Sequence, residues 1–306
     1  MQGVDQRRNR RDEGGLRFMD WFNGVHEQER EKPFKILLFA YPRSGSSLIG
    51  DLLSAANRSR YYFEPLYFID DLDPSTYNFS KRAEEILDSL FRCDLRKVDA
   101  AAGKTKRYKA WKKGKGYGDP PCVSSQLDYI VQKVIRLPAT HHVIDWLERN
   151  PDILVIHLVR DTRGIANSIS NQPKSHAFDG DLWKICDQMW VDVLAVDSLP
   201  RHRWRRVRYE DAVRDPFSAM EELYDFMNIP YTEEVQGRIG AHFGRGLEEA
   251  RSNYVKYYYS TYRNASEIDP ERWRGQLDAG RISSIEEMCG RVLDVLGYSR
   301  GNAIDL

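Results

Sequence analysis

Short apolar runs alternate along the chain with segments whose apolar residues recur every three or four positions. Runs of four to eight apolar residues predict strands, and the longer spacing predicts amphipathic helices. The expected strands cover residues 34–41, 60–63, 131–137, 153–159 and 205–209. The expected helices cover residues 46–56, 84–91, 140–149, 162–170, 182–196, 216–227 and 283–296, the last of which ends at Gly297.

This alternation predicts an α/β fold. Strands joined by right-handed helical crossovers form a mostly parallel sheet flanked by helices on both faces. We expect residues 1–32 to be a flexible polar leader and residues 33–300 to form one domain around this sheet. Because ligands bind beyond the carboxyl ends of such strands, residues at those ends are the candidates for chemistry.

Charge and hydropathy limit the classes of protein to consider. The 46 basic side chains balance 46 acidic ones, so the overall charge does not indicate a nucleic-acid-binding protein. No apolar run reaches the roughly 20 residues that a membrane-spanning helix needs. We therefore expect either a natively soluble protein or a segment from which a preceding membrane anchor is missing.

The cysteines leave two interpretations open. Four are present, at positions 93, 122, 186 and 289. They could form two disulfides in an oxidising compartment or remain four unpaired thiols. No pair has CxxC spacing and no His/Cys cluster accompanies them, so we predict no metal site. Three N-x-S sequons, at Asn57, Asn78 and Asn264, mildly favour a secretory-pathway protein.

The first candidate anion site follows the first expected strand. Residues 42–47 read Pro-Arg-Ser-Gly-Ser-Ser and lead directly into a helix. Gly45 allows close backbone approach, and N–H groups at a helix N-terminus attract an anion. Ser46 and Ser47 add hydroxyl donors, and Arg43 adds a planar cation. A plain strand–helix turn with a serine N-cap is the alternative, and the absence of Walker A spacing disfavours an ordinary ATP or GTP hydrolase.

The second candidate anion site follows the most strongly predicted strand, at 153–159. Arg160 comes directly after this strand, and Ser168 lies eight residues on, about two turns into the next helix. A cation and a hydroxyl so placed could bind a second, separate phosphate. A surface Arg160–Asp161 pair that begins a helix would give the same sequence.

Both segments resemble motifs of the Golgi carbohydrate sulfotransferases, most closely the group that sulfates the 6-hydroxyl of galactose, N-acetylglucosamine or N-acetylgalactosamine. Residues 41–47 look like that family's 5′-phosphosulfate loop, and residues 158–168 are similar to its 3′-phosphate motif. Further segments that fit in order are 63–66, 133–137, 207–211, 262–266 and 273–274. The resemblance spans about residues 34–300. The family usually has proline where Thr162 stands.

The resemblance implies a P-loop-like fold and a metal-independent enzyme that transfers a sulfuryl group from 3′-phosphoadenosine 5′-phosphosulfate (PAPS) to a sugar hydroxyl. It implies a glycan or glycosaminoglycan acceptor and a membrane-anchored enzyme of the Golgi lumen, although no anchor is visible here. The residues expected to hold the 5′-phosphosulfate are Arg43, Ser44, Gly45, Ser46 and Ser47. Arg160 and Ser168 would hold the 3′-phosphate, and Arg263 would be a further nucleotide contact.

Glu64 is the candidate general base, because it ends the second expected strand beside the anion-binding loop. It could instead be a structural carboxylate paired with a neighbouring arginine. Lys133 and Arg136, at the end of the third strand, could stabilise sulfate charge together with Arg43 or grip the acceptor. They could equally form a salt-bridged strand end.

One segment is strongly basic and contains no acid. Its cations are Lys104, Lys106, Arg107, Lys109, Lys112, Lys113 and Lys115, interleaved with Tyr108 and Trp111. It could be a solvated, mobile loop. It could also be a docking surface for a polyanionic acceptor whose sugar rings stack on the two aromatics. Nucleic acid would suit such a patch, but nothing else in the chain supports it.

Two other functions remain as alternatives. A nucleotide kinase or other phosphoryl transferase could use a related sheet, but it would want a P-loop lysine that the first loop lacks. A glycan-binding relative could have kept the fold and lost turnover. The presence of Arg43, Glu64, Arg160 and Ser168 argues against that second possibility.

Overall fold

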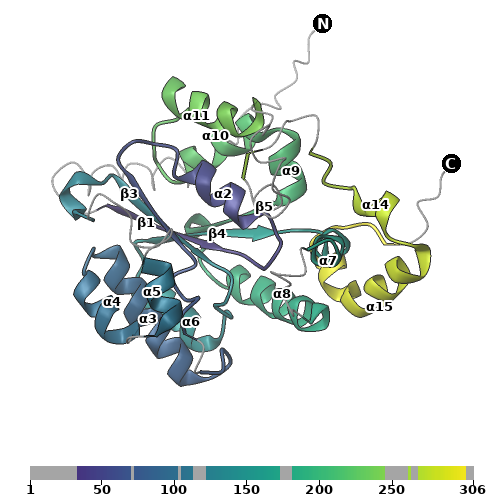
Figure 1. The fold of residues 1–306 in the computed structure, drawn as a ribbon, viewed down its shortest axis with the longest axis horizontal. Helices are drawn as coiled ribbons and strands as arrows, with labels where there is room; N and C mark the ends of the chain where they lie inside the picture. Colours follow the sequence, from purple (N-terminus) through teal and green to yellow (C-terminus); the bar gives the residue numbers. More distant parts are fainter. Residues whose placement is uncertain are drawn as a thin grey trace, which may run out of the picture.

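The computed structural model describes residues 33–69, 72–102, 105–112, 122–172, 181–244, 261–262 and 268–300; the expected leader lies outside these ranges. The described residues form one five-stranded sheet in the order β2-β3-β1-β4-β5 (Figure 1). All neighbouring strands run parallel. The strands are β1 (Phe34–Phe39), β2 (Ser59–Phe63), β3 (Tyr129–Val134), β4 (Ile153–Val159) and β5 (Trp204–Arg208). The predicted parallel α/β sheet is confirmed.

Helices pack on both faces of this sheet (Figure 1). One face carries α2 (Ser46–Leu53), α9 (Tyr209–Arg214), α10 (Pro216–Phe226) and α11 (Glu233–Gly244). The other carries α3 (Tyr77–Phe91), α4 (Leu95–Ala102), α5 (Lys106–Trp111), α6 (His141–Arg149), α7 (Thr162–Ser170), α8 (Leu182–Asp197) and α15 (Ala279–Val295). The short helix α14 (Trp273–Gln276) contacts α7.

Alternate residues of β1 serve the two cores. Ile36 and Leu38 belong to the core under α2 and α10, whereas Leu37 and Phe39 belong to the core under α3 and α8. Because β1 is the central strand, both of its faces are buried and its sequence reads as a continuous apolar run. The buried strand ends at Phe39, and the loop that leads to α2 follows it.

Several predicted helix and strand boundaries were wrong, and the residues that cap the helices explain two of them. The helix expected at 84–91 begins at Tyr77, where the Thr76 side chain accepts a hydrogen bond from the Phe79 N–H. The strand expected to reach residue 209 ends at Arg208, because Tyr209 begins α9. The last helix begins at Ala279, capped by Asp278. Helices α4, α5, α9, α11 and α14 were not predicted.

The cysteines form two disulfides. Cys93 pairs with Cys122, and Cys186 pairs with Cys289, each with a Cα–Cα distance of 5.3 Å. The second disulfide joins α8 to α15, so it fixes the C-terminal helix against the body of the domain. Among the described residues, no helix is long and apolar enough to cross a bilayer.

Removing the Cys186–Cys289 disulfide by a double change to alanine should lower the free energy of unfolding by about 3–5 kcal/mol. The same change at Cys93 and Cys122 should cost about 1 kcal/mol less, because its partners are 29 rather than 103 residues apart and close a shorter loop. Urea denaturation under non-reducing conditions measures both. Equal losses for the two variants would contradict this ordering.

Candidate active site

The loop between β1 and α2 is built as an anion cradle. Arg43 and Gly45 both have positive φ, 63° and 88°, and the Ser44 hydroxyl donates to the Tyr41 carbonyl at 2.7 Å. A chain turned in this way points successive N–H groups to one side. The residue that precedes α2 is Gly45, and no side chain caps the helix. The alternative of a serine-capped turn is therefore not what forms, and the first N–H groups of α2 remain for a ligand.

The second candidate element meets this loop directly. Arg160, just after β4, donates from Nη1 to the Arg43 carbonyl oxygen at 2.9 Å. The Arg43 side chain reaches in the other direction, from Nε to the Ser168 hydroxyl on α7 at 3.1 Å. Two hydrogen bonds thus join the residues that the sequence placed in two separate anion sites.

Arg160 is held in place with one donor unused. Its Nε is buried and has no hydrogen-bond partner among the described residues, and its guanidinium lies 4.4 Å from the centre of the Tyr209 ring. A side chain on Gly164 would place its Cβ 3.1 Å from this Nε. The absence of a side chain on Gly164 therefore provides the space for the Arg160 guanidinium. A buried N–H without an acceptor is costly, which favours a ligand that supplies one.

Tyr209 is a site residue for which the sequence indicated no role. Besides contacting Arg160, its ring occupies the space beside Gly45, where a Cβ added to this glycine would lie only 2.3 Å from the nearest ring carbon. One aromatic ring therefore contacts both candidate anion-binding elements. The segment 207–211 was noted in the sequence, but nothing in its composition indicated that Tyr209 would reach the loop after β1.

A third group of residues lies on the other side of the loop. Lys133 on β3 is 1% exposed and donates to Glu64 Oε1 at 2.8 Å and to the Ser47 hydroxyl at 3.3 Å. Arg136 binds the other Glu64 oxygen at 2.5 Å. Glu64 itself has a positive φ of 47°, an unusual conformation for a non-glycine residue. The structure thus brings Glu64, Lys133 and the anion-binding loop together.

Electrostatics keep Glu64 ionised. Burial alone would raise the pKa of its carboxyl, but the charges of Lys133 and Arg136 outweigh burial, and the pKa lies below its ordinary value. The ion pairs match the structural alternative that the sequence left open for Glu64. They do not exclude proton transfer, since an ionised carboxylate can accept a proton, and the role of general base stays a prediction.

A buried polar network lies at the start of the loop between β1 and α2. The Tyr41 hydroxyl lies 2.8 Å from His157 Nε2 on β4. Burial, followed by the charge of Arg206, lowers the pKa of His157 to about 3, so the ring is neutral at physiological pH. Burial also raises the pKa of nearby Asp192 to about 7. This network was not predicted, because His157 and Asp192 lie inside segments that are otherwise mostly apolar.

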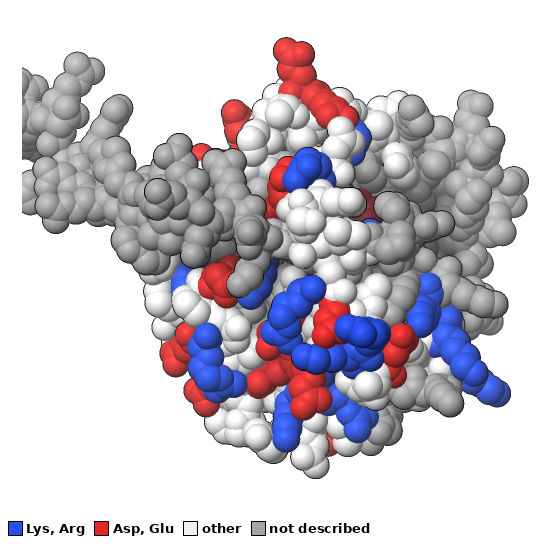
Figure 2. All heavy atoms as spheres, turned by 90° about the vertical axis from the view of Figure 1, so that its left-hand side faces the viewer, with Lys and Arg blue, Asp and Glu red and all other residues white. Residues whose placement is uncertain are grey.

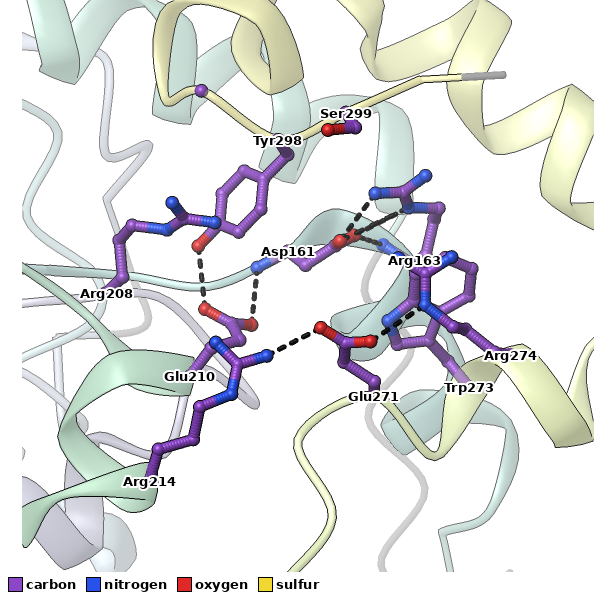
Figure 3. A pocket seen from close by; sticks show the side chains of 11 residues that line it. Asp161, Arg163, Arg208, Glu210, Arg214, Glu271, Trp273, Arg274, Tyr298 and Ser299 are labelled. Atoms are coloured by element: carbon purple, nitrogen blue, oxygen red, sulfur yellow. Dashed lines mark hydrogen bonds and ion pairs between the residues drawn. The ribbon is translucent and has the colours of Figure 1, made fainter. Parts of the chain in front are cut away.

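A cavity of about 270 Å³ lies beside Asp161, the residue that follows Arg160 (Figure 3). Three of the arginines that line it are ion-paired: Arg163 pairs with Asp161 at 2.7 Å, and Arg214 and Arg274 both pair with Glu271. Glu210 accepts hydrogen bonds from the Asp161 N–H and the Tyr298 hydroxyl. These bonds tie α7, α9 and the chain after α15 together around Asp161. They fix the chain next to Arg160, which does not itself line the cavity.

The basic segment differs from both of its predicted forms. Its described part is helix α5 and the residue after it, not a loop, while Lys104, Lys113 and Lys115 lie outside the described residues. Tyr108 and Trp111 are buried in the core, at 4% and 6% exposure, so they are not available to stack on sugar rings. Arg263 also lies outside the described residues. No group of metal-ligating side chains occurs among the residues described.

A family model described as "Sulfotransferase family" matches residues 35–233. The chain belongs to this family. It is 27% identical to carbohydrate sulfotransferase 1 of Danio rerio, with 88% of this chain and 78% of the relative aligned. Carbohydrate sulfotransferase 4 of Mus musculus is 22% identical, with 89% and 83% aligned. The predicted resemblance is confirmed, and membership of this family replaces the phosphoryl-transferase alternative.

The fold agrees with this assignment. The sulfotransferase domain of the Synechococcus PCC 7002 olefin synthase superposes with a TM-score of 0.52 at 16% identity, covering 89% of this chain and 98% of that domain. At this identity the match speaks for the fold alone. It confirms the P-loop-like sulfotransferase fold expected from the sequence.

Changing Gly45 to alanine should destabilise the protein by about 1–3 kcal/mol, because the new Cβ would overlap the Tyr209 ring and the backbone has a positive φ. Gly237→Ala on α11 is the matched control, since nothing lies within 4 Å of its added Cβ. Alanine there should keep or slightly raise the melting temperature. A Gly45→Ala protein as stable as the wild type would show that the loop and Tyr209 are not in contact.

Proposed function

We propose that this protein transfers a sulfuryl group from PAPS to a sugar hydroxyl of a glycan or glycosaminoglycan, at the 6-position of galactose, N-acetylglucosamine or N-acetylgalactosamine. The observation that supports it most is the direct contact between the two anion-binding elements. Arg160, with its unused buried Nε, donates to the carbonyl of Arg43 in the other element. One nucleotide with phosphates at both ends could therefore touch both elements.

The residues present suit such a donor. The N–H groups of residues 45–47, at the N-terminus of α2, would bind the 5′-phosphosulfate, because the Ser44 N–H already donates to the Tyr41 carbonyl. Arg160 and Ser168 would bind the 3′-phosphate, and Arg43, which donates a hydrogen bond to Ser168, would add its charge to the phosphosulfate site. A guanidinium matches the geometry of phosphate oxygens through paired hydrogen bonds. These contacts make the 3′-phosphate the feature by which the enzyme prefers PAPS to ATP.

Glu64 and Lys133 are the residues proposed to take part in the transfer step. When bound, PAPS supplies a sulfuryl group whose bond to the 5′-phosphate oxygen breaks as the acceptor oxygen bonds to sulfur, leaving the electron pair on the phosphate. Glu64 takes the proton of the acceptor hydroxyl. Lys133, which contacts both Glu64 and Ser47, places positive charge where oxygens gain negative charge.

The acceptor is inferred from the relatives. The relatives aligned over most of the chain include carbohydrate sulfotransferases 1, 3, 4 and 5, which supports a sugar acceptor. The resemblance of the motifs supports the 6-position. The simplest test incubates the protein with labelled PAPS and a panel of neutral and acidic glycans, without added metal. Sulfated product is expected; transfer from ATP in place of PAPS, or glycan binding without turnover, would contradict the proposal.

Two disulfides support a site of action in the secretory pathway. Disulfides persist in oxidising compartments and are rare in the cytosol. The Golgi lumen, where PAPS-dependent glycan sulfation of the resembled family takes place, is the compartment we propose. Two of the sequon asparagines, Asn57 and Asn78, are exposed, as glycan attachment requires.

Arg160→Ala should raise the Michaelis constant for PAPS by at least about tenfold, the scale of one lost charge-assisted contact. The measurement is initial rate against PAPS concentration at saturating acceptor. Arg58→Ala is the control, because it removes an arginine that is paired with Asp128 and 57% exposed, just before β2 at the other end of the sheet. An unchanged constant for Arg160→Ala would exclude this residue from the 3′-phosphate site.

Glu64→Gln should reduce kcat at least about a hundredfold, the usual contribution of a general base, with the PAPS Michaelis constant within about twofold of wild type. The amide oxygen can still accept from Lys133, so the fold should survive, which melting curves would verify. Glu84→Gln, another acid paired with an arginine, should leave kcat unchanged. Near-normal turnover by Glu64→Gln would leave Glu64 with only the structural role.

A further inference from the structure

An exposed tyrosine beside Glu64 is contacted by two arginines from different parts of the chain. Tyr67 is 38% exposed and is positioned by a turn in which its N–H donates to the Glu64 carbonyl at 3.0 Å. The guanidinium of Arg136 lies 5.2 Å from the centre of its ring, and that of Arg107 lies 5.4 Å away. Both distances are within the range of a cation–π contact.

The packing of helix α5 positions Arg107 beside Tyr67. Trp111 donates from Nε1 to the carbonyl of Phe63, the residue before Glu64, at 2.6 Å. Phe68 packs against both Tyr108 and Trp111, at ring distances of 4.9 and 5.3 Å. The aromatics that the sequence suggested for sugar stacking thus anchor the helix, and they fix Arg107 relative to the candidate base.

Basic side chains do not form a continuous patch on this part of the surface. Figure 2 shows the side of the molecule that carries α3 and α4, where basic side chains are interspersed with acidic ones. Lys112 is paired with Asp99 at 2.7 Å, and Lys97 with Asp94 at 3.7 Å. A diffuse polyanion-binding surface is therefore not favoured there. The arrangement around Tyr67 is local and specific instead.

We propose that Arg107, Tyr67 and Arg136 form an acceptor subsite that binds an acidic sugar, through its carboxylate or its sulfate, next to the sugar that is sulfated. The inference rests on the proposed function, because it places the acceptor hydroxyl at Glu64. A guanidinium presents its N–H donors in a planar fork, a geometry that matches a carboxylate or a sulfate. The exposed part of the Tyr67 ring offers an apolar surface to the pyranose between them.

Direct binding tests the subsite without relying on turnover. The probe is a tetrasaccharide that carries both hexuronate and sulfate, compared with its desulfated and its carboxyl-reduced forms. Calorimetry measures their dissociation constants in the presence of adenosine 3′,5′-bisphosphate. The wild type should bind the intact probe at least about tenfold more tightly than one of the two neutralised forms. Which form loses affinity identifies the acidic group.

Arg107→Ala should lower this preference to about threefold or less, whereas the matched control Lys109→Ala should retain it. Lys109 is also exposed, but it lies two positions further along α5 and so faces away from Arg107. Equal binding of all three probes by the wild type, or an equal loss in the Lys109→Ala control, would overturn the proposal. Discrimination between the probes by a protein that transfers no sulfuryl group would keep the subsite and reject the proposed function.

Discussion

The hydrogen bond from the Arg160 guanidinium to the Arg43 carbonyl joins the two loops on which the candidate active site depends. It can form because β1 and β4 are neighbours in register, with Phe39 opposite His157, so both strands deliver their loops to the same edge of the sheet. Tyr209, which directly follows β5, packs against both loops through its ring. Gly45 leaves space for that ring, and Gly164 leaves space for the Arg160 side chain.

The strand order extends this arrangement to the acceptor side. Because β1 lies between β3 and β4, its loop has Arg160 on one side and Lys133 on the other. Lys133 connects Ser47 of the loop to Glu64 at the end of β2, and the turn after Glu64 presents Tyr67. The groups proposed to bind the donor, accept the proton and bind the acceptor therefore follow one another along the carboxyl edge of a single sheet, as expected for parallel α/β folds.

The sequence predicted the parts of this site that lie close together along the chain. The strand at 153–159 and the helix at 162–170 were placed correctly, because their apolar periodicity is strong, and the loop at 42–47 carries its own glycine and serines. Contacts between distant segments could not be predicted from spacing. Tyr209 meets Gly45 only through the fold, and His157 meets Tyr41 across two strands. Short helices were the other weakness: α5 has six residues and a basic sequence, and the Thr105 cap together with the burial of Tyr108 and Trp111 fixes it as a helix.

The central claim is that one nucleotide touches both loops through phosphates at its two ends. Calorimetric titration of the wild-type protein with adenosine 3′,5′-bisphosphate and with adenosine 5′-phosphate compares two ligands that differ only in the 3′-phosphate. The bisphosphate should bind at least about tenfold more tightly, the scale of a charge-assisted contact to Arg160. Equal affinities for the two nucleotides would contradict the claim.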